Sequence, residues 1–335
     1  MIPEIKAQFT EDILNEAIQR YDIEPGDVRS LGGFESFVYE YAKNGKSYVL
    51  KITHTIRRTV DYIMGELEWL NHLADQGITV ARAIPSAKGQ WIEEIPKDQG
   101  SFLVISYEKA RGNAISTEVW NESLFEAWGE LIGNIHRATK KYEVSSAKYK
   151  RQAWEVEEQL RAETYLMPND VMIDILKERV NRLRLIPQTR DTYGLVHADL
   201  HQKNFYLDGQ NMHVFDFDDC HYTYFINDIG ITLYYALWYP AKKYENKEEY
   251  YRTFFHCFMR GYLKQNTVTV EEVSYLHDFM KIRHTLLYII LHQTSDITTL
   301  NPEQLKIRAQ HQSEIVTEEP LLPIDFVYEF TQIHN

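Results

Sequence analysis

The sequence predicts an α+β fold in two parts, a smaller part built on an antiparallel sheet and a larger, mostly helical part. Between residues 28 and 107, short alternating apolar segments bounded by turn residues are typical of strands, and one longer segment has helical spacing. From Thr117 onward, most apolar residues recur at helical spacing. Strands followed by helices indicate an α+β arrangement, and 335 residues are enough for one large domain or two lobes.

The first elements lead to a pair of glycines. Apolar spacing predicts a helix over Phe9–Tyr21, and alternation predicts a strand over Val28–Leu31. Gly32 and Gly33 follow that strand directly. Two glycines between strands let backbone amides approach a phosphate closely, although the same pair also occurs in plain turns.

Lys51 lies within the predicted strand Lys46–Thr53, between apolar neighbours. A lysine in such a run needs a partner or a ligand, although the pattern taken alone favours a lysine on an edge strand. The helix predicted over Val60–Asp75 supplies acidic residues close by in the sequence. Glu66 is in register with the apolar stripe of this helix, whereas its competitor Glu68 lies on a different face.

The remaining elements complete the sheet and then build the helical part. Two further strands are predicted over Gln90–Ile95 and Ser101–Tyr107. After Thr117, helical spacing predicts a series of helices, the last of them short: Leu124–Thr139, Gln152–Arg161, Asp170–Leu185, Ile231–Tyr239, Glu248–Leu263, Val270–Ser295, Pro302–Ile315 and one within Glu318–Asn335.

The stretch 194–219 concentrates the residues that suggest chemistry. Asp199 opens a polar loop, and Asn204 follows it by five positions. A predicted hairpin over residues 205–215 ends on Asp216, so we expect it to return Asp216 to the end where Asn204 lies. Two carboxylates and a carboxamide in one place suit Mg²⁺, which prefers hard oxygen ligands and usually keeps waters and substrate phosphates.

This stretch reads H-A-D-L-H-Q-K-N and then V-F-D-F-D-D. It resembles the catalytic and metal loops of the aminoglycoside phosphotransferase and choline kinase superfamily, which has a protein-kinase-like fold. The D-F-D-D ending is most similar to the bacterial branch of homoserine kinase type II and stress-response kinases. The resemblance covers roughly Val28 to Tyr235 and departs at Ser36, where the family's glycine-rich loop usually has Asn.

The resemblance implies ATP-dependent transfer of the γ-phosphoryl group to a hydroxyl of a small molecule, such as an aminoglycoside, an amino alcohol, a homoserine-like compound or a sugar. The implied site residues are the base Asp199, the Mg²⁺ ligands Asn204 and Asp216, the ATP-phosphate residues Lys51, Glu66, Gly32 and Gly33, the adenine-hinge residues Ser106 and Glu108, and the accessory residues His197, His201 and Asp218.

Further expectations concern the residues around the catalytic loop. His197 and Asp228 are expected to brace the loop, and His136 to pack in the core. Asp218 would contact a second metal or the acceptor, or would be a solvated acid.

The implied lobes are an N-terminal lobe over 1–105, a hinge over 106–112 and a helical lobe over 113–335.

Two alternatives to a small-molecule kinase stay open. One is a protein Ser/Thr kinase of the stress-response type, which is disfavoured because no A-P-E segment is present and little room exists for an activation loop. The other is a non-catalytic nucleotide-binding module, which would be expected to lose Asp199, Asn204 or Asp216. All three residues are present.

Composition limits the partners. A formal net charge of −13 disfavours nucleic acid, because that binding depends on basic patches. Two cysteines cannot form a disulfide framework, and no apolar run is long enough to span a bilayer. We therefore expect a cytoplasmic protein without a membrane partner, and its oligomeric state stays open.

Aromatic residues follow the metal loop closely. The segment Cys220–Tyr239 is rich in tyrosine, and aromatic faces attract cations. A cationic acceptor that meets Tyr224 or Trp238 is one expectation. Packing of these rings in the core is the competing one, because several of them fall at helical spacing.

Overall fold

The computed structural model describes residues 2–33, 35–156, 160–236, 244–294 and 299–333. Packing divides the chain into two compact units, which are described separately. The first unit comprises Met1–Asn113, Tyr142–Arg151 and Phe205–Asp218, and the second comprises Ala114–Lys141, Gln152–Asn204 and Asp219–Asn335.

The first unit extends past the expected lobe boundaries and includes a hairpin that we expected in the helical lobe. This hairpin consists of β8 (Phe205–Asp208) and β9 (Asn211–Val214). Backbone hydrogen bonds attach it to the first unit, because the Ala81 amide donates to the Val214 carbonyl (2.8 Å) and the Val214 amide donates to the Thr79 carbonyl (3.0 Å). The hairpin itself confirms the strand–turn–strand prediction for residues 205–215.

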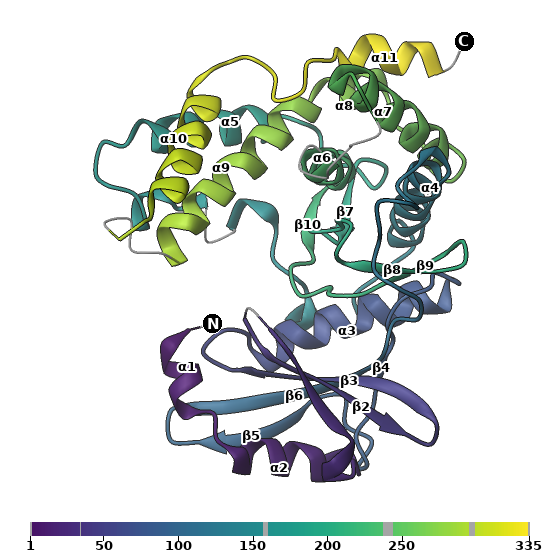
Figure 1. Ribbon diagram of the computed structural model, residues 1–335, viewed down its shortest axis with the longest axis vertical. Coiled ribbons are helices and arrows are strands. Elements are labelled where there is room, and N and C mark those ends of the chain that lie inside the picture. Colours follow the sequence, from purple (N-terminus) through teal and green to yellow (C-terminus); the bar gives the residue numbers. More distant parts are fainter. Residues whose placement is uncertain (1, 34, 157–159, 237–243, 295–298, 334–335) are drawn as a thin grey trace. The chain divides into compact units, whose positions relative to one another are not determined.

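A six-stranded antiparallel sheet forms the centre of the first unit (Figure 1). The strand order is β1-β2-β3-β6-β4, and β5 pairs with β6 off this path. The strands are β1 (Val28–Gly32), β2 (Phe37–Lys43), β3 (Lys46–His54), β4 (Ala83–Ile84), β5 (Glu93–Lys97) and β6 (Gly100–Glu108). The helices on its two faces are α1 (Pro3–Gln8) and α2 (Glu11–Arg20) on one side and α3 (Val60–Asp75) on the other.

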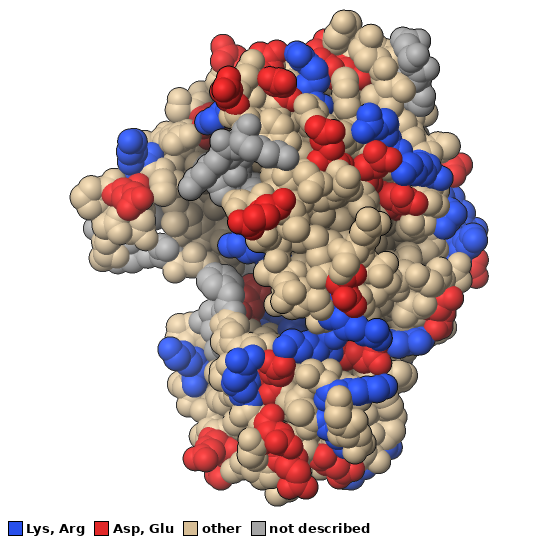
Figure 2. Space-filling view, turned by 45° about the vertical axis from the view of Figure 1, so that its right-hand side comes forward, with Lys and Arg blue, Asp and Glu red and all other residues tan. Residues whose placement is uncertain are grey.

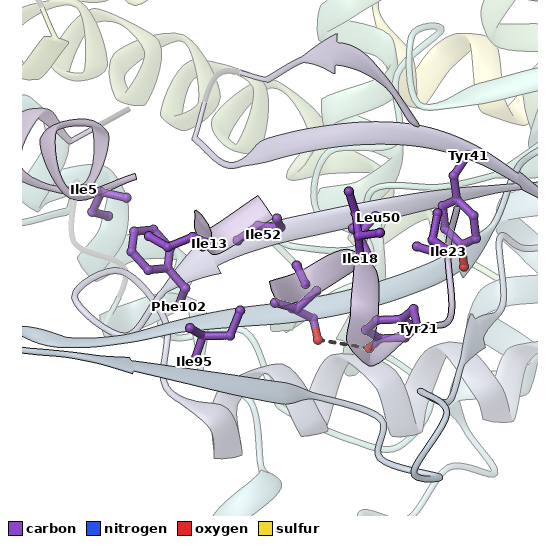
Figure 3. Close-up of a cluster of buried hydrophobic side chains, with 12 residues drawn as sticks. Ile5, Ile13, Ile18, Tyr21, Ile23, Tyr41, Leu50, Ile52, Ile95 and Phe102 are labelled. Atoms are coloured by element: carbon purple, nitrogen blue, oxygen red, sulfur yellow. Dashed lines mark hydrogen bonds between the residues drawn. The ribbon is translucent and has the colours of Figure 1, made fainter. Parts of the chain in front are cut away.

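The core between α2 and the sheet determines which way β3 presents its side chains. Leu50 and Ile52 are fully buried against Ile13 and Ile18 of α2 (Figure 3). Because successive strand residues point to opposite faces, Lys51 between them points to the face that α3 covers. The apolar pattern of one strand therefore positions a lysine on the opposite side of the sheet.

Helix α3 begins and ends where the sequence predicts. Thr59 caps its start, because the Thr59 hydroxyl accepts a hydrogen bond from the Tyr62 amide. Its buried stripe includes Ile63, Leu67 and Leu70. The stripe faces the sheet and places Glu66, which is also buried, on the same side.

The second unit is mostly helical, which with the first unit confirms the predicted α+β class. A two-stranded sheet of β7 (Tyr193–Val196) and β10 (His221–Tyr224) accompanies the helices. The helices are α4 (Glu122–Thr139), α5 (Val171–Leu183), α6 (Phe225–Ala236), α7 (Lys247–Leu263), α8 (Val270–Ser274), α9 (Leu276–Thr294), α10 (Pro302–Val316) and α11 (Phe326–Ile333).

Glycines allow the closest helix contact in this unit, between α4 and α7. A Cβ on Gly129 would lie 1.8 Å from the Phe258 carbonyl oxygen, and a Cβ on Gly261 would lie 1.9 Å from the Glu126 carbonyl oxygen. Helix α6 packs along α9, and α5 and α10 both contact α9 (Figure 1). These contacts hold α6 and α9 firmly, and both helices carry residues of the site described below.

Three helix predictions need correction. Gln152–Arg161 is not an α-helix among its described residues. The Gln152 carbonyl accepts a hydrogen bond from the Tyr222 amide (2.9 Å), and the helical residues that follow, Trp154–Val156 and Leu160, are 3₁₀. The helix predicted over Val270–Ser295 is interrupted at Tyr275, which caps α8. Helix α6 begins at Phe225, earlier than predicted, and residues 237–239 of that prediction lie outside the described residues.

Charged side chains of both signs are interspersed over the face shown in Figure 2. The net charge of −13 is therefore not concentrated in one acidic region of that face. In the part of the chain that the structure describes, no helix combines the length and apolar character needed to cross a membrane.

Candidate active site

The Lys51 ammonium lies among acidic side chains of the first unit. Its Nζ is 3.4 Å from a carboxylate oxygen of Asp218 and 3.8 Å from one of Asp216. Burial by itself lowers the pKa of Lys51, but the charges of Asp218, Asp216 and Glu66 together raise it above the usual value. Lys51 is thus held as a fixed cation on the α3 side of the sheet.

Glu66 is buried on α3, and its closest polar contact differs from the one implied by the resemblance. Its carboxylate accepts a hydrogen bond from the Tyr107 hydroxyl (3.1 Å), whereas the acidic groups within 4.0 Å of Lys51 are Asp216 and Asp218. Burial raises the pKa of Glu66, and the nearby Lys51 opposes this. Glu66 acts on Lys51 through its charge at a longer distance. Its competitor Glu68 instead accepts a hydrogen bond from Ser145 on the exposed side of the helix.

Asp218 is largely buried, so the alternative of a solvated acid is wrong. Its side chain is 13% exposed and makes ion pairs with Lys51 and with Arg57 (2.5 Å). Its backbone carbonyl accepts a hydrogen bond from Arg151 (2.5 Å). Although burial by itself raises the pKa of Asp218, the surrounding cations hold it far below its usual range.

The glycine pair adopts backbone angles that other residues rarely accept. Gly32 has φ 83° and Gly33 has φ 142°. A Cβ on Gly33 would lie 2.0 Å from the Ser36 carbonyl oxygen, so the loop is tightly folded on itself. Both glycines line an open hollow of about 430 Å³ bounded by β1 and β2. Phe34 between them and Glu35 lies outside the described residues.

The first part of the expected hinge is strand in the structure. Ser106 and Glu108 both belong to β6, opposite Leu50 and Tyr48 of β3. The Ser106 hydroxyl is bonded to the Tyr41 hydroxyl (2.7 Å), and the Glu108 amide donates to the Arg82 carbonyl (2.8 Å). Pairing on both sides of β6 therefore extends the sheet through Glu108, beyond the predicted end at Tyr107.

Asp216 follows β9 by two residues in a strained conformation. Its φ is 64°, in the left-handed region that residues other than glycine seldom occupy. Its side chain is 55% exposed, in contrast to the buried Asp218. Such strain is common at functional sites, and here it accompanies a carboxylate that solvent can reach.

The loop that holds Asp199, in the second unit, contains a second strained turn. Ala198 has φ 65°, and its amide donates to Oδ1 of Asp228 (2.8 Å). The amide of His197 donates to Oδ2 of the same carboxylate (3.2 Å). Asp228 thus accepts hydrogen bonds from both consecutive amides of the turn, as expected for a residue that braces this loop.

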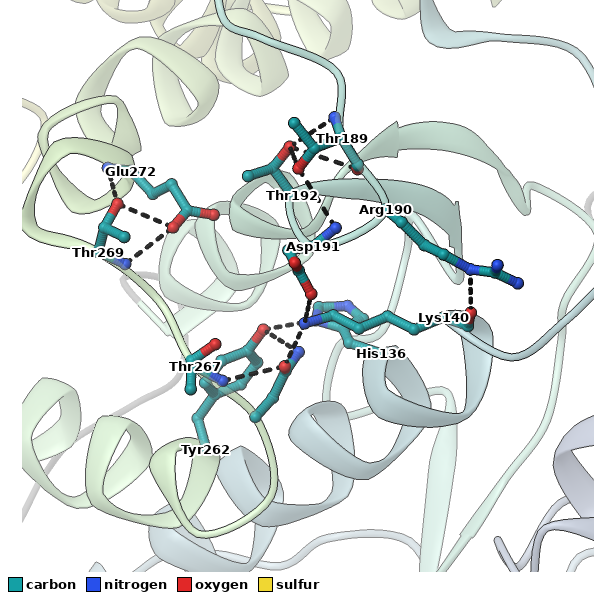
Figure 4. Close-up of polar contacts among 11 residues, drawn as sticks. His136, Lys140, Thr189, Arg190, Asp191, Thr192, Tyr262, Thr267, Thr269 and Glu272 are labelled. Carbon is teal, nitrogen blue, oxygen red and sulfur yellow. Dashed lines mark hydrogen bonds and ion pairs between the residues drawn. The ribbon is translucent and has the colours of Figure 1, made fainter.

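Two histidines complete the support of the loop. His136 is fully buried and joins Asp228 (3.2 Å) to the Tyr262 hydroxyl (3.0 Å); its place in a wider polar network is shown in Figure 4. The Nδ1 atom of His197 accepts a hydrogen bond from the Asp199 amide (3.3 Å). His136 is therefore a packed core residue that also orients the brace.

Each oxygen of the Asp199 carboxylate has its own partners. Oδ1 forms an ion pair with Arg283 of α9, and Oδ2 accepts a hydrogen bond from the Asn204 amide nitrogen (3.2 Å). His201 lies 3.5 Å from Oδ2. Arg283 is also bonded to the Tyr235 hydroxyl of α6 (2.6 Å). Residues from α6, α9 and the loop thus fix the orientation of one carboxylate.

Burial and charge oppose each other at Asp199. Burial raises the pKa of Asp199 above its usual value, while Arg283 and His201 act to lower it. The pKa of His201 is itself lowered by burial. A carboxylate with a raised pKa and a fixed orientation is suited to accept a proton.

Of the two aromatic residues expected to meet a cationic acceptor, the prediction for Tyr224 is wrong. Tyr224 is 1% exposed, and its hydroxyl donates to the Ile186 carbonyl (2.8 Å). Trp238 lies outside the described residues. The aromatic ring near Asp199 is Tyr235, whose centroid lies 5.3 Å from the guanidinium carbon of Arg283.

Sequence reasoning missed two arginines of this site. Arg57 and Arg283 contact Asp218 and Asp199, although they are far away in the sequence. The available signals were weak: a basic pair after the strand of Lys51, and a K-I-R-H run inside an otherwise apolar helix. Neither signal shows which acidic residue the arginine contacts.

The chain was compared with known proteins. Residues 27–262 match the family described as "Phosphotransferase enzyme family". The chain belongs to this family. Amicoumacin kinase of Bacillus subtilis (strain 168) is 42% identical over 326 residues, covering 96% of this chain and 97% of that protein.

Solved structures agree with this membership. Amicoumacin kinase hAmiN in complex with AMP-PNP, Ca²⁺ and Ami has a TM-score of 0.94 and 42% identity, covering 97% of this chain and 99% of that chain. The microcompartment-associated aminopropanol kinase has a TM-score of 0.72 at 18% identity, covering 91% and 94%, and this likeness shows the fold alone. The predicted family and its kinase-like fold are confirmed.

This member of the phosphotransferase family is an enzyme that transfers a phosphoryl group from ATP to a hydroxyl of a small molecule. The prediction of that activity is confirmed. The two alternatives, a protein Ser/Thr kinase and a non-catalytic module, find no support in these similarities, because the nearly full-length relative is named for a small molecule.

Proposed function

We propose that this phosphotransferase acts on a hydroxyl of amicoumacin or of a compound closely related to it. The observation that carries the proposal is the 42% identity to an amicoumacin kinase, which extends over 96% of the chain. Similarity of that extent includes the helices of the second unit, whereas the structures below 25% identity share only the fold.

In this proposal Asp199 orients the acceptor hydroxyl and takes its proton. The carboxylate is buried and its two oxygens are held from different sides, so it is preorganised for that role. A positioned general base typically contributes about 10²–10⁴-fold to the rate. His197 and Asp228 support the loop and take no part in proton transfer.

Lys51 is proposed to hold the ATP phosphates. It is a fixed cation, because acidic neighbours raise its pKa. Phosphoryl transfer depends mainly on positioning and on neutralising charge, which a fixed cation provides. Gly32 and Gly33 are proposed to bring backbone amides to the same phosphates, and Glu66 to keep the surroundings of Lys51 electrostatically balanced.

A divalent cation, which we propose is Mg²⁺, would be held by Asn204 and Asp216. The residues fit this group: the Asn204 side-chain nitrogen bonds to Asp199, which turns its oxygen acceptor away from that carboxylate, and Asp216 is more than half exposed. Asn204 precedes β8 directly, Asp216 follows β9 closely, and Phe205 pairs with Val214 across the hairpin.

The described residues contain no cluster of three or more His, Cys, Asp or Glu side chains arranged for a metal. A small protein ligand set suits Mg²⁺, which takes its remaining oxygens from water and phosphates. When bound, such a cation neutralises charge on the phosphates. Mg²⁺ is distinguished from the Ca²⁺ seen in the relative by its demand for octahedral oxygen geometry.

We also place the enzyme in the cytoplasm. Cys220 and Cys257 are buried thiols that do not form a disulfide, which suits a reducing compartment. With a net charge of −13, a nucleic-acid partner is not part of the proposal.

A panel of acceptors tests the proposed substrate. Purified enzyme with ATP and Mg²⁺ is incubated with amicoumacin, an aminoglycoside, an amino alcohol, homoserine and a sugar, and phosphorylated products are identified by mass spectrometry. The proposal predicts by far the highest kcat/KM for amicoumacin. Efficient phosphorylation of another class, with amicoumacin left unmodified, would overturn the proposed acceptor and leave the phosphotransferase activity intact.

A further inference from the structure

Arg57 follows β3 in the first unit and links two loops through its side chain. The guanidinium forms an ion pair with Glu35, which lies two residues after Gly33 in the glycine-rich loop. It forms a second ion pair with Asp218, 2.5 Å away. The Arg57 side chain is 9% exposed, so a charged group is held within the protein beside the glycine-rich loop.

Asp218 brings two cations together. One of its oxygens lies 3.4 Å from Lys51 Nζ, and the other lies 2.5 Å from Nη2 of Arg57. One buried carboxylate thus contacts both cations, and each cation has a further acidic partner, Glu35 for Arg57 and Asp216 for Lys51. Asp216 is also near Lys51, at 3.8 Å, but it is more than half exposed and is the proposed metal ligand.

The other end of the Arg57 guanidinium has a donor that the described residues do not satisfy. Nη1 is buried and donates to no acceptor within them. The hydroxyl of Ser36, at the position where the family usually has Asn, is likewise buried and without a partner in the described part of the chain. A buried charged donor without an acceptor lowers the stability of the folded protein. The site therefore favours a ligand that supplies a hydrogen-bond acceptor.

We propose that Arg57 is a second phosphate-binding residue, which acts beside Lys51 on the triphosphate of ATP. The chemistry agrees at each step. A guanidinium presents several N–H donors in a planar fork that matches phosphate oxygens, and it stays charged when buried. A triphosphate supplies oxygen acceptors for the Arg57 Nη1 donor that the described residues leave without one. Arg57 also reaches Glu35, so it couples occupation of the phosphate site to the glycine-rich loop.

Asp218 has a distinct part in this arrangement. It is a positioning residue that holds Lys51 and Arg57 on its two oxygens, and it does not touch the nucleotide. The inference rests on the ATP-dependent activity of the family but not on the identity of the acceptor. Nucleotide binding can therefore test it without any acceptor present.

The test compares the variants Arg57→Gln and Arg57→Lys with the wild type. Calorimetry in the presence of Mg²⁺ measures the affinities for ATP, ADP and adenosine. Loss of charge-assisted hydrogen bonds to phosphate should weaken ATP binding by about 10- to 100-fold in Arg57→Gln. Adenosine, which has no phosphate, should bind both variants as it binds the wild type. Arg57→Lys keeps the positive charge but loses the planar fork of donors, so its ATP affinity should lie between those of Arg57→Gln and the wild type.

Arg82→Gln is the matched control. It removes one positive charge from the same unit, where Arg82 pairs with Asp75 on the surface, and it should bind ATP normally. Equal weakening of ATP and adenosine in the Arg57 variants would indicate a structural role and overturn the proposal, as would unchanged ATP affinity in Arg57→Gln. If the Gln variant does not fold, unchanged ATP affinity in Arg57→Lys is the overturning result. A wild-type protein that binds no ATP at all would instead contradict the ATP-dependent activity.

Discussion

At the scale of single residues, the site is a set of buried charges whose partners come from distant parts of the chain. A lysine inside an apolar strand needs a partner, but the strand pattern taken alone favoured an edge-strand lysine, whereas β3 lies between β2 and β6 and Lys51 has acidic partners. The nearest partners are Asp218 and Asp216, more than 160 positions away, and not the helical Glu66 that sequence spacing suggested. Sequence patterns show that a charge is buried, but they do not show which distant residue meets it.

The strained and exposed carboxylate of Asp216 leads to a prediction about metal dependence. In Asp216→Ala, ATP affinity should lose most of its dependence on Mg²⁺, because a hard cation loses its carboxylate ligand. Titration calorimetry with and without Mg²⁺ measures this. Asp208→Ala removes an exposed acid from the other end of the same hairpin and should keep the wild-type dependence. Retention of full dependence in Asp216→Ala would place the metal elsewhere.

At the scale of elements, local patterns predicted the strands and most helices, and failed where tertiary contacts override them. Helix α3 matches its prediction at both ends because a threonine cap and a regular apolar stripe agree. The segment Gln152–Arg161 has apolar residues for a helix, but its first residues bond to β10 instead. The bends around Ala198 and Asp216 could be located by motif, while their left-handed angles are visible only in the structure.

The hydrogen bonds from Asp228 to the catalytic loop lead to a prediction about stability. Asp228→Ala should lower the free energy of unfolding by about 3 kcal/mol, because two buried backbone amides and His136 lose their acceptor. Urea denaturation followed by circular dichroism measures the change. Asp191→Ala is the control: this acid is 84% exposed and pairs only with Lys140 among the described residues, so a change below about 1 kcal/mol is expected. An equal loss of unfolding free energy in both variants would contradict the proposal that Asp228 braces the loop.

At the scale of the whole molecule, buried and half-buried histidines make the free energy of unfolding depend on pH. Burial is the main cause that lowers the pKa of eight of them, in one case, His284, to about 3: His54, His136, His201, His213, His277, His284, His292 and His311. Such a group is neutral in the folded protein and takes up a proton more readily when unfolded. Its contribution is therefore complete above the unfolded pKa of about 6.5 and is lost as the pH falls below it.

The urea midpoint should accordingly stay nearly constant above about pH 7 and fall steadily as the pH is lowered toward about 5. Asp228 adds a further loss only below about pH 4, near the pKa of an unfolded Asp, because its pKa is lowered in the folded state: although burial raises it, hydrogen bonding to His136 and the loop amide and nearby charge outweigh that effect. Denaturation at a series of pH values in one buffer of constant ionic strength measures the profile. A midpoint that is flat or rises between about pH 7 and 5 would contradict it.

The central claim is that Asp199 is the base in transfer of the ATP γ-phosphoryl group to an alcohol. The most direct measurement is the rate at which phosphorylated amicoumacin forms with wild-type enzyme and with Asp199→Asn, alongside ATP affinity measured by calorimetry. We predict that turnover falls by about 10²–10⁴-fold while ATP affinity stays within about twofold of wild type. Wild-type turnover in Asp199→Asn, on any acceptor that the enzyme phosphorylates, would contradict the account.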